Sequence, residues 1–103
     1  MKFLAIAKQK DSLMMVPPAV LRQLLESSFE AMRQQKQQGK IVDYFYSPAG
    51  YSIVIVDEPS IDAWMEDQMA IPVLSYCDQE IYPLGDIEVA MKGYIENVKA
   101  AGG

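Results

Sequence analysis

The sequence predicts an α+β fold whose elements follow one another in the order β-α-β-β-α-β, with one further helix at the C-terminus. Short runs rich in β-branched and aromatic residues alternate with longer stretches that have helical periodicity. Two of the short runs, residues 3–7 and 53–56, are apolar at every position. Continuous apolar runs are typical of strands that are covered on both faces. The sequence therefore predicts two central strands that need an apolar neighbour on each side of the sheet.

The first half of the chain is predicted to form a strand, a connection and a long helix. Residues 2–8 form the strand and residues 9–16 the connection. The pair Pro17-Pro18 marks the start of the helix, because proline is tolerated only in a first helical turn. Gly39 is a suitable helix stop. One stripe of this helix carries apolar side chains together with two polar ones: Leu21, Leu24, Leu25, Ser28, Met32 and Gln35.

A hairpin is predicted next, with strands at residues 40–46 and 51–56 joined by the turn Ser47-Pro48-Ala49-Gly50. Ser60 is the expected N-cap of a shorter helix that continues to about Ala70.

Pro72 ends that helix. Residues 74–82 are then predicted to be the fourth strand, and residues 85–103 the C-terminal helix. Trp64 and Met65, on the shorter helix, are expected in the core.

This order of elements is the ferredoxin-like plan, with sheet order 4-1-3-2, and 103 residues suit a single domain spanning residues 1–103. Acidic residues in the second and fourth strands fit their edge positions. Two helices cover only one face of such a sheet, and soluble monomers avoid large exposed apolar patches. We therefore expect self-association into a homodimer or a higher oligomer. The alternative is that the C-terminal helix folds over the second face.

Composition excludes several classes of function. The net charge is −5 and the few basic residues are scattered, so no nucleic-acid partner is expected. No apolar run reaches the ~20 residues of a membrane span, and no membrane association is expected. The N-terminal apolar run is too short for a signal peptide, and Cys77 is the only cysteine, so a cytoplasmic location is predicted.

The sequence also argues against metal and cofactor chemistry. It has no histidine, which is the commonest transition-metal ligand and the commonest general base near neutral pH. A zinc site would need mostly carboxylates, which zinc seldom uses alone. No glycine-rich phosphate loop is present. We therefore expect no metal and no cofactor.

Residues 51–84, YSIVIVDEPSIDAWMEDQMAIPVLSYCDQEIYPL, resemble the muconolactone isomerase family and its dimeric α/β-barrel relatives. The features that carry the resemblance are a Tyr-Ser strand, an Asp followed by Pro-Ser at a helix start, a Met and a Pro after that helix, and a Tyr-x-Asp-x-Glu strand. Weaker similarity extends back to residue 1.

The resemblance implies a cofactor-independent oligomer in which paired sheets build a barrel and a proton is moved within a small unsaturated lactone acid. The chain departs from the family at two positions. Ser28 occupies a place where isomerising members have a carboxylate, and Asp43 occupies that of a histidine.

Candidate catalytic residues are the strand carboxylates Asp43, Asp78 and Glu80, since a carboxylate in an apolar pocket can act as a general base. Asp78 and Glu80 are two positions apart and are expected to share a face with Tyr76 and Tyr82. Ser28, Tyr44, Tyr51 and Tyr76 are candidate substrate-binding residues.

Each of these residues also has a structural interpretation, because edge-strand carboxylates can face water and tyrosines are frequent in oligomer interfaces. Two functions therefore stay open. One is a cofactor-free isomerase, or a related lyase or oxygenase, that acts on a small unsaturated lactone or aromatic acid. The other is a non-catalytic oligomer that binds a small molecule or a partner protein.

Overall fold

A computed structural model describes residues 1–103, and its element order confirms the predicted plan. Three short 3-10 segments, η1, η2 and η3, lie between the main elements. The main elements are β1 (Lys2–Gln9), α1 (Pro18–Gln37), β2 (Ile41–Ser47), β3 (Tyr51–Asp57), α2 (Ile61–Asp67), β4 (Cys77–Leu84) and α3 (Ile87–Ala100), and the 3-10 segments are η1 (Asp11–Met15), η2 (Gln68–Ala70) and η3 (Pro72–Tyr76).

The four strands form one antiparallel sheet in the order β2-β3-β1-β4, which is the predicted 4-1-3-2 order counted from the other edge. β1 and β3 are central, as their apolar sequences indicate. In this register Lys8 lies opposite both Tyr51 and Asp78, and Ile6 lies opposite both Ile53 and Glu80. Side chains from all four strands therefore line up in rows across the sheet.

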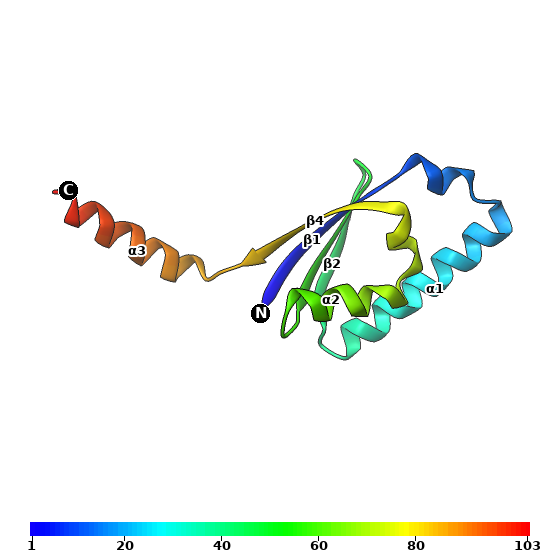
Figure 1. Ribbon diagram of the computed structural model, residues 1–103, viewed down its shortest axis with the longest axis horizontal. Helices are drawn as coiled ribbons and strands as arrows, with labels where there is room; N and C mark the ends of the chain where they lie inside the picture. Colours follow the sequence, from blue (N-terminus) through cyan, green and yellow to red (C-terminus); the bar gives the residue numbers. More distant parts are fainter.

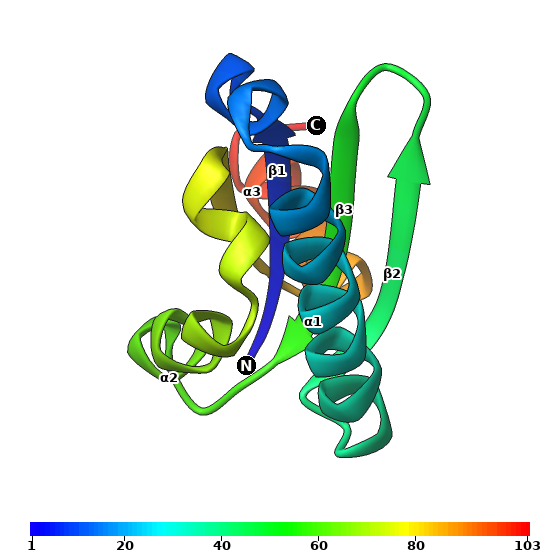
Figure 2. The same cartoon turned by 90° about the vertical axis from the view of Figure 1, so that its right-hand side faces the viewer.

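The helices α1 and α2 cover one face of the sheet (Figure 2). The core lies between them and the sheet, where Phe3, Val54 and Val56 pack with Trp64 and Ile71. Trp64 is 1% exposed, which confirms its predicted place in the core. The same prediction is wrong for Met65, which is 46% exposed on the outer side of α2.

The fourth strand begins at Cys77 and not at Leu74, so this predicted boundary is wrong. Pro72 occupies the first position of η3, where its fixed φ angle favours a helical turn. The hydroxyl of Ser75 donates to the Pro72 carbonyl over 2.8 Å and stabilises that turn. Tyr76 consequently lies in the 3-10 segment and does not share a strand face with Asp78 and Glu80.

The opposite face of the sheet is uncovered. We call it the open face; its centre carries Leu4, Ile6, Ile53 and Ile55, and Phe45 lies on it along β2. The C-terminal helix α3 extends away from the sheet, so the molecule measures 64 × 28 × 21 Å (Figure 1). The alternative in which this helix covers the second face is therefore wrong for the isolated chain.

Every residue of α3 is exposed, although one stripe of the helix is apolar. No helix of the structure combines the length and the hydropathy that crossing a membrane requires. The stripe consists of Ile87, Met91, Tyr94, Ile95 and Val98, each at least half exposed.

Candidate functional site

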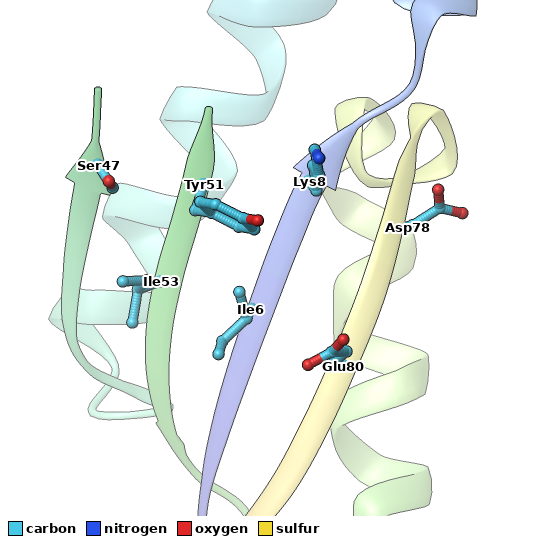
Figure 3. A pocket seen from close by; sticks show the side chains of 7 residues that line it. All are labelled: Ile6, Lys8, Ser47, Tyr51, Ile53, Asp78 and Glu80. Carbon is cyan, nitrogen blue, oxygen red and sulfur yellow. The ribbon is translucent and has the colours of Figure 1, made fainter. Parts of the chain in front are cut away.

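The open face is hollowed where β1 ends and the β2–β3 hairpin turns. The hollow has a volume of about 580 Å³, and all four strands contribute side chains to it (Figure 3). Its floor is apolar and its walls carry a cation, two carboxylates and two hydroxyls. The lining residues are Ile6, Lys8, Ser47, Tyr51, Ile53, Asp78 and Glu80.

Three of the seven site residues predicted from the sequence lie together here, namely Tyr51, Asp78 and Glu80. In Figure 3 the Tyr51 ring and the Glu80 carboxylate point toward β1 from opposite sides, and Asp78 points toward the outer edge of the sheet. Asp78 is also 3.7 Å from the ammonium group of Lys10. Glu80 is therefore the carboxylate that faces the hollow.

Glu80 has a partner on its own strand face. The Tyr82 hydroxyl donates a 2.7 Å hydrogen bond to Glu80 Oε2. That hydrogen bond, followed by the nearby carboxylate charge, raises the pKa of Tyr82 above its ordinary value. Tyr82 therefore stays protonated at neutral pH and holds the Glu80 carboxylate in place.

Lys8 is the cation of the hollow, and it was missed as a site residue from the sequence. Its Nζ lies 5.6 Å from the centroid of the Tyr51 ring. The predicted strand order could have indicated Lys8, because the order 4-1-3-2 places β1 between the strands that carry Tyr51 and Asp78. An ammonium group beside a phenol and an apolar floor can bind the carboxylate of a small unsaturated acid.

The other four predicted site residues lie outside the hollow. Asp43 is on β2, where its Oδ1 is 3.4 Å from Lys36 Nζ and accepts from the main-chain N–H of Tyr44 over 2.9 Å. Tyr44 packs against the core on the helix side of the sheet, under the ammonium group of Lys36. Tyr76 lies in η3, and its carbonyl accepts from the main-chain N–H of Lys10 over 2.8 Å.

Ser28 is buried on α1, as its place in the apolar stripe predicts. Its hydroxyl donates to the Leu24 carbonyl over 2.7 Å and accepts from the main-chain N–H of Val73 over 3.0 Å. These two bonds fasten η3 to α1. They also occupy the hydroxyl hydrogen, so that Ser28 has no free donor for a ligand.

A second cavity lies on the helix side of the sheet. It has a volume of about 120 Å³, and ten of its thirteen lining residues are hydrophobic, including Val54, Trp64 and Ile71. The polar lining comes from Gln9, Ser52 and Gln79. No carboxylate lines this helix-side cavity, so it offers no general base.

A group of charged residues at the end of β3 was not recognised from the sequence. We call Glu58, Asp67 and Lys40 the Glu58 cluster. Glu58 is only 4% exposed, although it directly follows a strand and precedes Pro59. From the sequence it looked like one of the surface acids near the positive end of α2, and only the tertiary structure shows its burial.

Cys77 is half-buried at the start of β4. Desolvation by burial raises the pKa of its thiol, with a smaller contribution from Asp78 and an opposing one from Lys10. The thiol is therefore neutral at neutral pH and is a weak nucleophile. No group of three or more potential metal ligands gathers in the structure.

Comparison with known proteins gives a match at the level of structure. No protein-family model and no curated protein matches the sequence. The fold matches the crystal structure of muconolactone isomerase with a TM-score of 0.71 and 22% sequence identity, over 84% of this chain and 90% of that chain. It also matches protein Atu4242 from Agrobacterium tumefaciens, with a TM-score of 0.44 and 18% identity, over 82% of this chain and 94% of that one.

The chain is therefore a ferredoxin-like α+β protein. More specifically, it has a muconolactone isomerase-like fold, which confirms the expected resemblance at the level of the fold.

Proposed function

We propose that the protein is a cofactor-independent isomerase that transfers a proton within a small unsaturated lactone acid or aromatic acid at the open-face hollow. The observation that carries this proposal is the lining of one hollow by Glu80, Lys8 and Tyr51 above an apolar floor. Proton abstraction next to a carbonyl needs a base, a group that binds the substrate, and a donor for the developing enolate. This set of side chains supplies one candidate for each role.

In this mechanism Lys8 binds the carboxylate of the substrate, and the ring of the substrate lies over Ile6 and Ile53. Glu80 removes the proton from the γ-carbon of the unsaturated lactone, which gives a dienolate, and returns a proton to the carbon next to the carbonyl, so that the double bond moves by one position. The Tyr51 hydroxyl donates a hydrogen bond to the enolate oxygen. Asp78, which is paired with Lys10, contributes negative charge at the rim.

We further propose that a second copy of the chain covers the hollow. Glu80 faces solvent in the isolated chain, whereas the exclusion of water from an active site strengthens the electrostatic interactions inside it. The apolar side chains of the open face support self-association, because a monomer would leave them wet. The exposed apolar stripe of α3 supports it in the same way. A homodimer that buries these surfaces would enclose the hollow.

The test uses muconolactone, since the structural match is to an isomerase of that compound. Proton NMR in deuterium oxide follows both isomerisation and the uptake of deuterium next to the carbonyl. We expect turnover by the wild type and a loss of at least about 100-fold in Glu80→Gln. Lys8→Met should raise KM more than it lowers kcat. Glu26→Gln, on the exposed surface of α1, is the matched control and should keep full activity.

If neither muconolactone nor related unsaturated lactone acids exchange protons in the presence of the wild type, the proposal is wrong. It is equally wrong if Glu80→Gln retains full turnover.

A second candidate function is supported by the helix-side cavity. Its mainly hydrophobic lining suits a small aromatic molecule and contains no carboxylate for acid/base work. The protein would then be a non-catalytic binding module. Phenol should shift the NMR signal of the Trp64 indole in the wild type, and Ala7→Leu should abolish that shift by filling the cavity. Under the isomerase proposal Ala7→Leu leaves turnover unchanged.

A further inference from the structure

Glu58 is a buried carboxyl group at the junction of β3 and α2. One of its oxygens, Oε1, is buried without a hydrogen-bond partner. The main-chain N–H of Glu58 donates to the Met1 carbonyl over 2.9 Å, which holds the residue at the end of the sheet. A charged carboxylate with an unpartnered buried oxygen is costly, whereas a neutral carboxylic acid tolerates that environment.

Asp67 fastens the C-terminal end of α2 to the rest of the molecule. Its main-chain carbonyl accepts from Gln35 Nε2 over 2.9 Å, which ties α2 to α1. Its carboxylate pairs with Lys40 Nζ over 3.1 Å, which ties α2 to the segment before β2. One lysine therefore neutralises the carboxylate on which this end of α2 depends.

Four charged groups surround Glu58 or its immediate neighbours. Asp67 of α2 shares a side-chain hydrogen bond with it, Lys40 approaches from the segment before β2, and Asp57 precedes it on β3. The N-terminal ammonium group of Met1 lies 3.3 Å from Asp57 Oδ1. Desolvation by burial, reinforced by the hydrogen bond and the charge of Asp67, raises the pKa of Glu58 to about 7. Lys40 acts in the opposite direction and is outweighed.

The C-terminal part of α2 and the segment that follows it also form part of the wall of the helix-side cavity. Trp64, one turn before Asp67 on α2, forms part of the cavity wall, and Ile71 follows shortly after it. The N–H of the Trp64 indole is buried and has no hydrogen-bond partner. Movement of the C-terminal end of α2 would therefore expose both the cavity and this N–H group.

We propose that the Glu58 cluster is a proton-operated latch, which holds α2 closed over the helix-side cavity while Glu58 is protonated and releases it when Glu58 loses its proton to solvent. The ionised Glu58 would place a second buried negative charge beside Asp67, with Lys40 as the sole nearby cation of the pair. Opening of α2 hydrates the new charge. The latch does not depend on the isomerase proposal or on the presence of a ligand in the cavity.

Hydrogen exchange of the Trp64 indole N–H, followed by NMR, measures this opening directly. Trp64 is the only tryptophan, so its indole signal is unambiguous. After correction for the intrinsic exchange rate, we expect the protection factor to fall by more than about tenfold between pH 5.5 and 7.5. In Glu58→Gln, a neutral isostere, protection should be high and independent of pH. Glu66→Gln, an exposed carboxylate next to Asp67, is the matched control and should behave like the wild type.

Urea separates release of α2 from global unfolding. Local opening exposes little surface, so indole exchange at low urea concentrations should be nearly independent of urea, whereas exchange of the Val56 amide should accelerate. A constant protection factor in the wild type, or a fall that persists in Glu58→Gln, would overturn the proposal. If Glu58→Gln does not fold, Glu58→Met serves instead, because it also removes the titrating group, and a pH-dependent fall as large as that of the wild type would then overturn the proposal.

Discussion

The hydroxyl of Tyr82 and the carboxylate of Glu80 form a 2.7 Å hydrogen bond on the open face of β4. The two residues are two positions apart, so the strand places them side by side at the exposed edge of the sheet. This bond orients the carboxylate that faces the hollow. It also makes the ionisation of the Tyr82 hydroxyl depend on the charge of Glu80.

The Tyr82–Glu80 bond predicts a tyrosine that titrates late. Because the carboxylate stabilises the protonated phenol, the pKa of Tyr82 is raised above its ordinary value. In an ultraviolet titration, the number of tyrosines that ionise near the ordinary pKa of tyrosine should be one lower for the wild type than for Glu80→Gln. Identical titration curves for the two proteins would show that the bond is not formed in solution.

Ser28 should contribute to stability. In Ser28→Ala the main-chain N–H of Val73 loses its acceptor, and an unsatisfied buried donor costs about 1–3 kcal/mol. The neighbouring Ser27 is exposed, so Ser27→Ala is a matched control that should change the free energy of unfolding by less than about 0.5 kcal/mol. Urea denaturation measures both. Equal effects of the two substitutions would contradict the role assigned to Ser28.

Global stability should fall as the pH rises toward neutrality. The pKa of Glu58 is raised from 4.5 in the unfolded chain to about 7 in the folded one, so the folded state binds more protons between these values. The contribution of Glu58 to the free energy of unfolding is complete below pH 4.5 and is lost as the pH rises to about 7. Asp67, whose pKa is lowered chiefly by its hydrogen bond with Glu58, acts in the opposite direction at lower pH.

The free energy of unfolding should therefore decrease by about 2 kcal/mol between pH 5 and 7.5. Urea denaturation of Glu58→Gln over the same range should show a much smaller decrease. A wild type whose stability is constant over this range would contradict the burial of Glu58.

Substitutions of two isoleucines should distinguish a contribution to folding from a contribution to self-association. Ile71 is 1% exposed, and Ile71→Ala should destabilise the chain by about 2–5 kcal/mol. Ile87, on α3, is 75% exposed, and Ile87→Ala should leave unfolding of the dilute chain nearly unchanged. The same change should weaken self-association if the apolar stripe of α3 lies against a second copy. Sedimentation velocity measures that effect, and self-association of Ile87→Ala as strong as that of the wild type would contradict a place for Ile87 in the interface.

The fold was predictable because its signals are local. Pro18, Gly39 and the doubly apolar strands indicate the boundaries and the order of the elements, and the sheet confirms that order. The fourth strand was the exception. Pro72 was interpreted only as the end of the preceding helix, although the same residue begins the 3-10 segment that delays β4 to Cys77.

The site was less predictable, because it depends on which side chains face one another across strands. Glu80 and Tyr51 lie on the two strands that flank β1. Lys8 completes the hollow because the register of β1 places it opposite residues of both neighbouring strands. Ser28 was correctly placed on the buried stripe, but its hydrogen bond to η3 required the position of Val73. The burial of Glu58 arises from contacts among three segments that are distant in sequence, so no local pattern could reveal it.

The central claim is that the open face and its hollow belong to an interface between copies of the chain. Multi-angle light scattering at micromolar concentration tests this claim most directly. The account predicts a mass at least twice the 11.6 kDa of one chain, reduced to one chain by Ile53→Lys at the centre of the open face. A wild-type mass of 11.6 kDa at that concentration would contradict it.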